Sequence, residues 1–255
     1  MAFVKTEVQG AVEIITIDRP KALNALNPEV LADLKAAFEA VDQETIRCIV
    51  LTGEGDKSFV AGADIGSMST MTKAEGEAFG KLGNDVFLMI EHFPIPVIAA
   101  VNGFALGGGN ELAMSCDIRI CSDNAVFGQP EVGLGITPGF GGTQRLARLV
   151  GMGMAKQLVY SALNIKADEA YRIGLVNAVY PQAELMENVL KLANKIAKGP
   201  LNCYSSSKLI LNKSFETNLE DLLKEETEAQ AAARLHPNGD EGLAAFLEKR
   251  KANFQ

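Results

Sequence analysis

Short β-branched runs alternate with amphipathic helix patterns along the first hundred residues, and this alternation restricts the fold more than any other feature. Residues 12–17 form a β-branched run that stops at Asp18-Arg19-Pro20, which predicts a strand. Asn27-Pro28-Glu29 is typical of a helix start, with a capping side chain, an early proline and an acid in the first turn. Residues 46–52 form a second β-branched run, closed by Gly53. This β-α-β order predicts a parallel sheet with right-handed crossovers.

The balance of strand and helix changes along the chain. A helix is expected over residues 74–92, and a third buried strand over residues 96–101 is expected to run through a turn into another helix. Beyond residue 142 helical patterns dominate, as in 155–161, 183–197, 219–235 and 239–252. We therefore expect an α/β core over residues 1–199 and a helical C-terminal region over residues 200–255.

Composition excludes several classes of protein. The 255 residues are 47% hydrophobic and 22% charged, which are ordinary globular values and rule out a disordered or fibrous chain. The formal net charge of −8 argues against a general nucleic-acid surface or an anionic-membrane surface. Residues 92–110 carry no Asp, Glu, Lys or Arg, but their prolines and glycines interrupt any apolar helix long enough to span a membrane.

Cysteine spacing and the N-terminal sequence bear on the compartment. The four cysteines at 48, 116, 121 and 203 form no CxxC pair and no secreted framework, so reduced thiols are expected. The first ten residues lack a basic segment followed by an apolar one, so no signal peptide is expected. Both features favour a cytoplasmic location.

Common cofactor and nucleophile motifs are missing from the sequence. Residues 53–58 resemble part of a phosphate-binding loop, but Asp56 stands directly before the lysine, where it would repel a phosphate. The first strand is not followed by the GxGxxG pattern of dinucleotide sites, and there is no GxSxG motif. The two histidines, His92 and His236, have no nucleophile or metal-ligand cluster nearby in sequence. We therefore expect no cofactor and no metal.

Three consecutive glycines, 107–109, mark the most informative stretch. They open an apolar helix pattern that contains Asn110 and Glu111. Glycines allow a ligand to approach the backbone closely, and the first N–H groups of a helix are unpaired and favour anions. Glu111 follows Gly108 by nearly one helical turn, so its carboxylate is expected beside whatever the Gly108 N–H binds. The alternative is that the glycines serve close packing alone and that Glu111 is a surface residue.

A second carboxylate and a third segment complete the pattern. Glu131 is the only charged residue between Asp123 and Arg145, which predicts partial burial and a raised pKa useful for proton transfer. The alternative is a buried glutamate with a structural hydrogen bond. Residues 59–65 place small side chains where a ligand can lie against backbone N–H groups. Backbone donors with two nearby acids suit a reaction through the enolate of an activated carbonyl.

Residues 96–120, PVIAAVNGFALGGGNELAMSCDIRI, resemble the signature of the enoyl-CoA hydratase (crotonase) family. Residues 19–26, 58–65, 127–131, 139–145 and 248–251 are similar to further family segments in the expected order. The resemblance covers essentially the whole chain. It implies an α/β crotonase-like fold, with a ββα spiral core and a helical C-terminal trimerisation region, assembled as a homotrimer or as a hexamer that is a dimer of trimers.

The resemblance also implies residue roles. The backbone N–H groups of Ala63 and Gly108 would form an oxyanion hole for the thioester oxygen. Glu111 and Glu131 would hold a water between them, with Glu111 as the base toward it and Glu131 governing the proton delivered to the α-carbon. Residues implied to bind substrate or coenzyme A are Lys21, Ala22, Leu23, Ala61, Asp64, Ile65, Gly66, Gly139 and Lys249, the last of these in its own or a neighbouring subunit.

The activity implied is that of a hydro-lyase, the reversible hydration of a short trans-2-enoyl-CoA such as crotonyl-CoA to the 3-hydroxyacyl-CoA. Similarity is greatest to bacterial short-chain members, which act in butyrate-type metabolism. Asn110 departs from the family pattern, in which many relatives carry Cys, and its expected effect is on substrate fit rather than chemistry. Two alternatives stay open, an enoyl-CoA isomerase of the same fold and an RNA-binding relative.

Overall fold

A six-stranded sheet forms the base of the molecule. The structure is a computed structural model, and it describes residues 1–254. The strand order is β1-β2-β3-β5-β7-β10, and every neighbouring pair is parallel except the antiparallel pair β1–β2. The strands are β1 (Val4–Gln9), β2 (Val12–Ile17), β3 (Cys48–Gly53), β5 (Val97–Val101), β7 (Ile118–Ser122) and β10 (Ala178–Tyr180).

A second sheet of four short strands stands beside the first. Its order is β4-β6-β8-β9, with only β9 antiparallel to its neighbour. The strands are β4 (Ser58–Val60), β6 (Phe104–Leu106), β8 (Val126–Gly128) and β9 (Asn164–Lys166). Along the chain β3 is followed by β4, β5 by β6 and β7 by β8, and the first two of these pairs lead directly into α-helices. This repeat is the ββα spiral expected from the resemblance.

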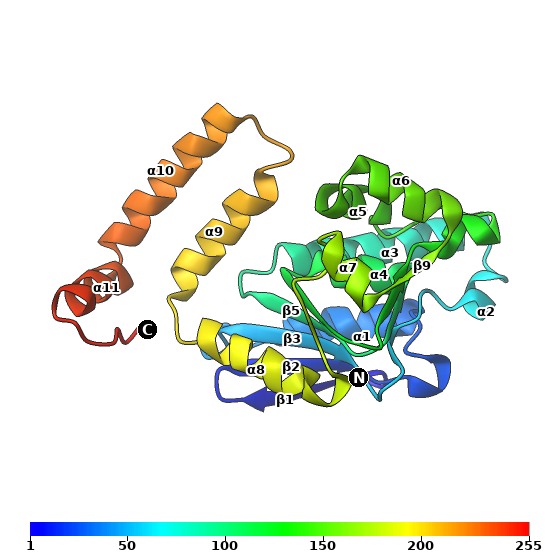
Figure 1. Cartoon of the computed structure of the whole chain (residues 1–255), viewed down its shortest axis with the longest axis horizontal. Coiled ribbons are helices and arrows are strands. Elements are labelled where there is room, and N and C mark those ends of the chain that lie inside the picture. Colours follow the sequence, from blue (N-terminus) through cyan, green and yellow to red (C-terminus); the bar gives the residue numbers. More distant parts are fainter. Residues whose placement is uncertain (255) are drawn as a thin grey trace.

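The predicted β-α-β unit at the N-terminus is present. Strands β2 and β3 are parallel neighbours, and α1 (Pro28–Glu39) connects them. The Asn27 side chain accepts a hydrogen bond from Val30 N at the start of α1, as the sequence predicts. The buried face of α1 packs into the larger part of the core, and α8 (Leu185–Ile196) packs against the opposite face of the sheet. Both faces of the large sheet are thus covered (Figure 1).

The expectation that the strand at 96–101 leads through a turn into the glycine-rich helix is wrong in one respect. Strand β6 intervenes, because the chain turns at Asn102-Gly103 and crosses from the large sheet to the small one. The Asn102 amide donates to the carbonyl oxygens of Gly53 and Gly55, and a Cβ at Gly103 would lie only 2.2 Å from Lys57 O. The strand that delivers the glycines to the site is therefore β6. Three-residue strands carry too short a pattern to be predicted from periodicity.

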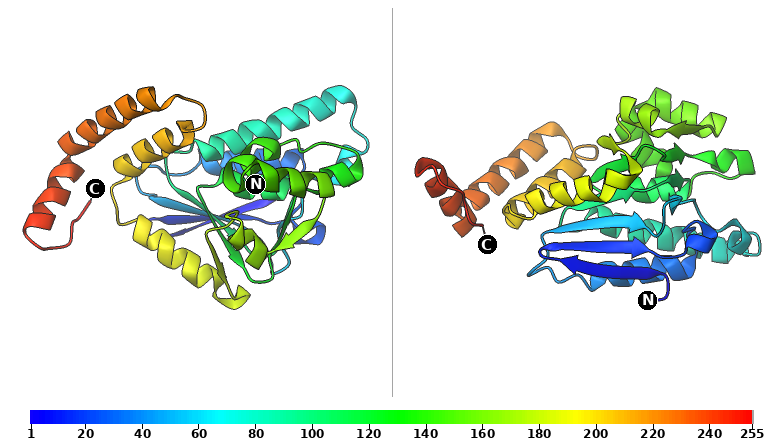
Figure 2. Two further views of the ribbon diagram at one scale, coloured as in Figure 1. Left: turned by 45° about the horizontal axis from the view of Figure 1, so that its top comes forward. Right: turned by 60° about the horizontal axis from the view of Figure 1, so that its bottom comes forward.

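Helices cover the upper part of the body and form a separate arm. The body helices are α2 (Ile65–Met68), α3 (Lys73–Glu91), α4 (Gly108–Ser115), α5 (Gly142–Val150), α6 (Met152–Ser161) and α7 (Ala167–Arg172), with short 3₁₀ turns η1 (Pro20–Ala22), η2 (Pro130–Leu134) and η3 (Gln182–Glu184). The arm consists of α9 (Leu201–Lys213), α10 (Leu219–Leu235) and α11 (Pro237–Leu247). The views of Figure 2 show that it projects from the body. Within residues 1–254 no helix has both the length and the apolar character to cross a membrane.

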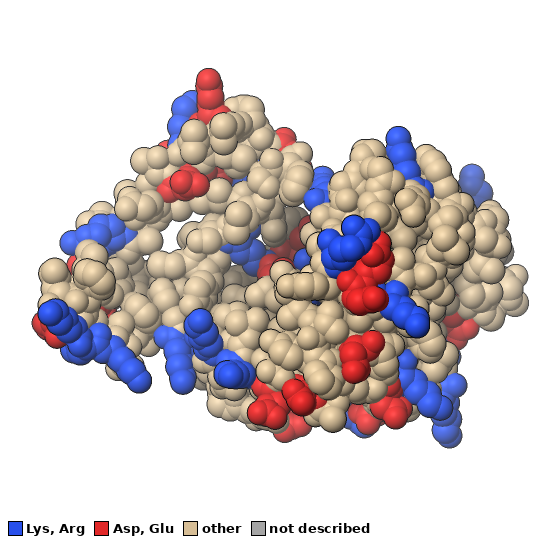
Figure 3. Space-filling view, viewed as in Figure 1, with Lys and Arg blue, Asp and Glu red and all other residues tan. Residues whose placement is uncertain are grey.

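A few polar contacts attach the arm to the body. Lys208 on α9 forms an ion pair with Asp117 over 2.8 Å, and the Asn212 side chain donates to Glu91 O over 2.8 Å. Large apolar side chains of the arm are exposed, among them Leu209, Leu211, Phe215, Leu219, Leu235, Phe246 and Leu247. Figure 3 shows the arm standing away from the body, with much of its visible face free of charged side chains.

Candidate functional site

A cavity of about 240 Å³ opens where the small sheet meets α2, α3, α4 and the turn before α5. Seven of the residues predicted for the site line it: Ala61, Ala63, Ile65, Gly108, Glu111, Glu131 and Gly139. Apolar side chains complete the wall, including Met68, Phe79, Leu134 and Phe140. The predicted acids and backbone donors therefore meet at one place, although they come from separate segments of the chain.

Two backbone N–H groups at this cavity are available to a ligand. Gly108 is the first residue of α4, so its N–H precedes the first bond within the helix, which runs from Glu111 N to Gly107 O. The residues on either side of Ala63 are hydrogen-bonded to Leu26: Leu26 N donates to Gly62 O, and Asp64 N donates to Leu26 O. The Ala63 N–H itself makes no hydrogen bond within residues 1–254. Within residues 1–254 neither N–H is therefore used by a hydrogen bond of the fold.

Gly107 and Gly109 are required for different structural reasons. Gly107 has φ +48°, and a Cβ there would lie 2.9 Å from Glu131 Oε1. A Cβ at Gly109 would lie 1.9 Å from Val60 O, which is backbone and cannot move aside. Close packing thus explains Gly109, while Gly107 leaves room for the Glu131 carboxylate.

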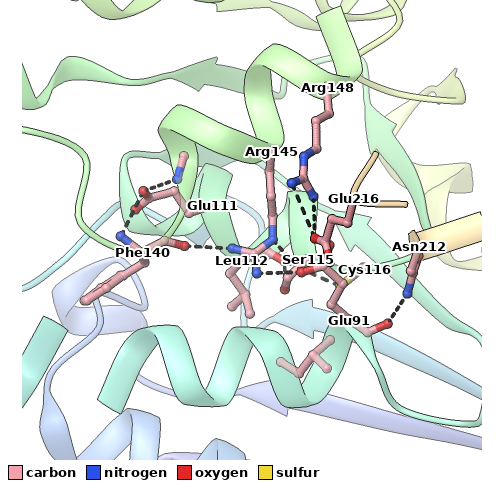
Figure 4. Close-up of polar contacts among 12 residues, drawn as sticks. Glu91, Glu111, Leu112, Ser115, Cys116, Phe140, Arg145, Arg148, Asn212 and Glu216 are labelled. Atoms are coloured by element: carbon pink, nitrogen blue, oxygen red, sulfur yellow. Dashed lines mark hydrogen bonds and ion pairs between the residues drawn. The ribbon is translucent and has the colours of Figure 1, made fainter. Parts of the chain in front are cut away.

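Glu111 is held by the turn that precedes α5. Its Oε1 atom accepts hydrogen bonds from Phe140 N over 3.0 Å and from Gly142 N over 2.7 Å (Figure 4). The residue is 1% exposed, so the alternative of a surface glutamate is wrong. Two backbone donors fix one oxygen of the carboxylate.

Glu131 lies in η2 and is 9% exposed, which confirms the predicted burial. Its Oε1 atom accepts from Gln129 Nε2 over 3.0 Å. Its Oε2 atom is buried and makes no hydrogen bond within residues 1–254. A buried oxygen without a partner destabilises a fold, and at a cavity wall it is available to a ligand proton or a water.

Burial shifts the proton affinity of both acids. It raises the pKa of Glu111 to about 7, helped by the negative charge of Glu131 and opposed by the N–H groups of Gly142 and Phe140. Burial also raises the pKa of Glu131, against the opposing Gln129 N–H. Because the two negative charges repel each other, the titration of each carboxyl depends on the other, and the titration steps belong to the pair.

The raised pKa of Glu111 makes stability depend on pH. The native state binds this proton more tightly than the unfolded state, whose carboxyl has an ordinary value near 4.5. Stability therefore falls as the pH rises from about 4.5 through 7, and the full loss is present above that. A shift of this size corresponds to about 3 kcal/mol.

Glu111→Gln is expected to stabilise the protein at pH 8, because it removes a buried charge and keeps an oxygen that can accept from Phe140 N and Gly142 N. We expect the melting temperature to rise by about 5 °C at pH 8 and by much less at pH 5. Thermal unfolding at both pH values measures this, with exposed Glu187→Gln on α8 as the control. A melting temperature that falls at pH 8 would show that the buried charge is not the dominant effect.

Sequence reasoning missed the residues that support the two acids. Gln129 is fully buried beside Glu131, and the Phe140–Gly142 turn supplies the donors to Glu111. Arg145 on α5 holds that turn by donating to Phe140 O over 2.9 Å, and it pairs with Glu91 over 2.6 Å (Figure 4). The glycine-rich run at 139–142 was the available signal, because glycines at a helix start expose backbone N–H groups.

Six predicted substrate or CoA residues do not line the cavity: Lys21, Ala22, Leu23, Asp64, Gly66 and Lys249. Lys21 and Leu23 border a separate depression near η1. Asp64 caps α2 through Ser67 N and pairs with Arg19 over 2.8 Å. Lys249 follows α11, at the far end of the arm from α2 (Figure 1). Their contact with CoA stays a prediction.

A larger cavity of about 480 Å³ lies between α9 and the body. Its acids are already paired, Glu91 with Arg145 and Asp117 with Lys208. It therefore lacks an unpaired acid of the kind found in the smaller cavity. Within residues 1–254 no group of three or more His, Cys, Asp or Glu side chains is placed to hold a metal ion.

The family model described as enoyl-CoA hydratase/isomerase matches residues 7–255. The chain belongs to this family. The short-chain-enoyl-CoA hydratase of Clostridium acetobutylicum is 54% identical over 246 residues, which cover 96% of this chain and 94% of that protein. The crotonyl-CoA hydratase of Syntrophomonas wolfei is also 54% identical, over 97% of this chain and 96% of that protein.

Solved structures of the family have the same fold. The crystal structure of enoyl-CoA hydratase from Bacillus anthracis matches with a TM-score of 0.96 at 35% identity, covering 99% of this chain and 98% of that one. An enoyl-CoA hydratase subunit from Geobacillus kaustophilus matches with a TM-score of 0.94 at 39% identity, covering 99% and 98%. The predictions of the crotonase family and of a crotonase-like α/β fold are confirmed.

Proposed function

We propose that the chain is a short-chain enoyl-CoA hydratase, which adds water reversibly and in the syn sense to trans-2-enoyl-CoA thioesters such as crotonyl-CoA. The observation that carries this proposal is the meeting of Glu111 and Glu131 in one cavity with the backbone donors of Ala63 and Gly108. Relatives at 54% identity that carry hydratase names agree with it. The predicted activity, that of a hydro-lyase, is thus the one that the comparisons support.

The two backbone donors would hold the thioester oxygen. Addition of water to C3 moves the C2=C3 electrons toward the thioester, which becomes an enolate with a negative oxygen. N–H groups of Ala63 and Gly108 stabilise that charge more than they stabilise the neutral carbonyl, which lowers the barrier. The start of α4 adds the favourable field of a helix N-terminus.

The two acids would move the protons. Glu111 takes a proton from the attacking water as its oxygen bonds to C3, and protonated Glu131 donates its proton to C2. A proton then passes from Glu111 to Glu131 through a second water, which restores the starting state. The cycle requires one proton on the pair, and burial, which raises the pKa of each acid, favours a protonated carboxyl at this site. The cycle uses only side chains, backbone N–H groups and water, and it needs no cofactor.

Retention of both acids favours a hydratase over the alternatives. An isomerase moves one proton along the acyl chain and needs no second acid to activate water. An RNA-binding role would require a basic surface, and the net charge of −8 does not supply one.

Side-by-side assays test the proposal. The purified protein is expected to hydrate crotonyl-CoA and to convert a 3-enoyl-CoA far more slowly, with turnover declining along a panel of longer trans-2-enoyl-CoA substrates because the cavity is small. Faster turnover of the 3-enoyl-CoA would favour the isomerase. Salt-dependent RNA binding without turnover of either substrate would favour an RNA-binding role.

We propose that CoA itself follows the surface from the cavity toward η1. Lys21, Ala22 and Leu23 occupy that turn, and Leu23 O accepts hydrogen bonds from Ala61 N and the Ser58 hydroxyl, which ties the turn to the cavity wall. Asp64 and Gly66 lie at the start of α2 next to Ile65, which lines the cavity. Lys249 would reach a CoA phosphate from a neighbouring subunit.

We propose that residues 200–255 form an oligomerisation region separate from the core of residues 1–199, in a homotrimer or a dimer of trimers. The exposed leucines and phenylalanines of the arm support this, because monomers rarely expose so many large apolar side chains together. The net negative charge and the free, mostly buried cysteines suit a cytoplasmic protein without a nucleic-acid or membrane partner.

A further inference from the structure

Three buried side chains form a hydrogen-bonded series beside the candidate cavity. Asn110 Nδ2 donates to Gln129 Oε1 over 2.9 Å, and Gln129 Nε2 donates to Glu131 Oε1 over 3.0 Å. Asn110 is 2% exposed, Gln129 is fully buried, and neither lines the cavity. Asn110 therefore acts on the site through Gln129 and not through contact with the acyl chain, unlike the predicted effect on substrate fit.

The orientation of each side-chain amide follows from the fact that its nitrogen donates hydrogen bonds and its oxygen accepts them. The Asn110 nitrogen only donates, so Gln129 turns its oxygen toward Asn110 and its N–H toward Glu131. With the Gln129 amide reversed, its oxygen would face the Glu131 carboxylate, which is one acceptor against another. Within residues 1–254 the Gln129 side chain has no other hydrogen-bond partner, so Asn110 and Glu131 together set its orientation.

Stabilisation of the fold does not explain why an asparagine stands at position 110. Its Oδ1 atom is buried and makes no hydrogen bond within residues 1–254. A buried polar atom without a partner destabilises the fold, and an apolar side chain of similar size would avoid that loss. The bond to Gln129 is the one polar contact that the side chain makes in the described part of the chain.

We propose that Asn110 is a positioning residue: it holds the Gln129 amide so that an N–H faces Glu131 Oε1 and Glu131 Oε2 is left for the substrate. This inference rests on the proposed hydratase function. The N–H favours the ionised form of Glu131. In the dehydration direction Glu131 must be ionised to take the α-proton, so Asn110 helps to set the pH at which dehydration begins.

Two other charged groups bear on the titration of Glu131, one directly and one through Glu111. Glu111, on α4, is the only other titratable residue among those that line the cavity, and Arg145, on α5, acts on Glu111. Neither contacts Asn110 through a side-chain hydrogen bond, so a change at Asn110 leaves both in place.

The test compares wild type with Asn110→Leu, which keeps the approximate shape and removes the donor. The readout is the pH dependence of kcat/KM for dehydration of 3-hydroxybutyryl-CoA. We expect its acidic limb to move to higher pH by about half to one unit, the size of one lost hydrogen bond to a carboxylate. We also expect kcat to fall, KM to change little and the melting temperature to stay equal or rise.

Two further variants make the result decisive. Gln129→Met is expected to shift the limb in the same direction, and adding Asn110→Leu to it should produce no further shift. Asn110→Ser keeps a hydroxyl donor and should recover part of the wild-type profile, even if the leucine variant folds poorly. An unmoved limb, or an additive shift in the double variant, overturns the proposal. Inactive wild type overturns the proposed function itself, whereas an active wild type with an unmoved limb overturns only the role of Asn110.

Discussion

Glu111→Gln and Glu131→Gln are each expected to lower kcat for crotonyl-CoA hydration by at least ~10²-fold, the usual contribution of a positioned acid or base. Each variant removes one of the two groups that exchange protons with water and the α-carbon. Glutamine has nearly the same shape, so binding of the thioester by the cavity should survive. Steady-state kinetics with crotonyl-CoA, together with the Kd for butyryl-CoA, which is saturated and cannot be hydrated, measure both effects.

The exposed substitution Glu187→Gln serves as the matched control and should keep wild-type turnover. Losses at the two acids should be far from additive, since both act in one proton cycle. Turnover close to wild type in either single variant would refute the two-acid assignment. Loss of butyryl-CoA binding along with turnover would instead indicate a binding role.

Arg145→Met is expected to destabilise the protein by about 3 kcal/mol, since it breaks a partly buried ion pair and leaves Phe140 O without its donor. Arg145 is 7% exposed and donates to both Glu91 and Phe140 O. The same turn donates two N–H groups to Glu111, so we also expect kcat to fall by about 10-fold as the carboxylate loses its fixed position. Urea unfolding and kcat measured below the melting transition test the two effects.

A neighbour on the same helix provides the control. Arg148 pairs with Glu216 over 3.4 Å and is more exposed, so Arg148→Met should cost less than about 1 kcal/mol. Adding Glu91→Leu to Arg145→Met removes the stranded carboxylate and should restore part of the stability but not kcat. Stability and kcat near wild type for Arg145→Met would contradict the role of Arg145 in holding the turn that binds Glu111.

The sequence predicted the larger elements and singled out Glu111, Glu131 and the glycine-rich helix start, while the pairing of Ala63 with Gly108 came from the family resemblance. The strand at 12–17 and the capped helix after Asn27 carry strong local patterns, and the structure has them where the sequence places them. Glu111 and Glu131 stood out because a charge inside a long apolar or glycine-rich run has few structural explanations. Such signals are contained within a few consecutive residues.

The supporting contacts could not be predicted in the same way. Strands β4, β6 and β8 have three residues each, so their pattern is too short to separate from a turn. Gln129 and Arg145 act through partners that are distant in sequence, such as Asn110 and Glu91, and only the fold brings these together. The CoA residues outside the cavity were taken from the family pattern, and the position of Lys249 would require a second subunit.

A crystal structure of the protein with butyryl-CoA would test the central claim most directly. We predict that the thioester oxygen lies about 3 Å from both Ala63 N and Gly108 N, with a water between the carboxylates of Glu111 and Glu131 beside C2 and C3. A thioester oxygen bound elsewhere, or either carboxylate turned away from the acyl chain, would contradict it.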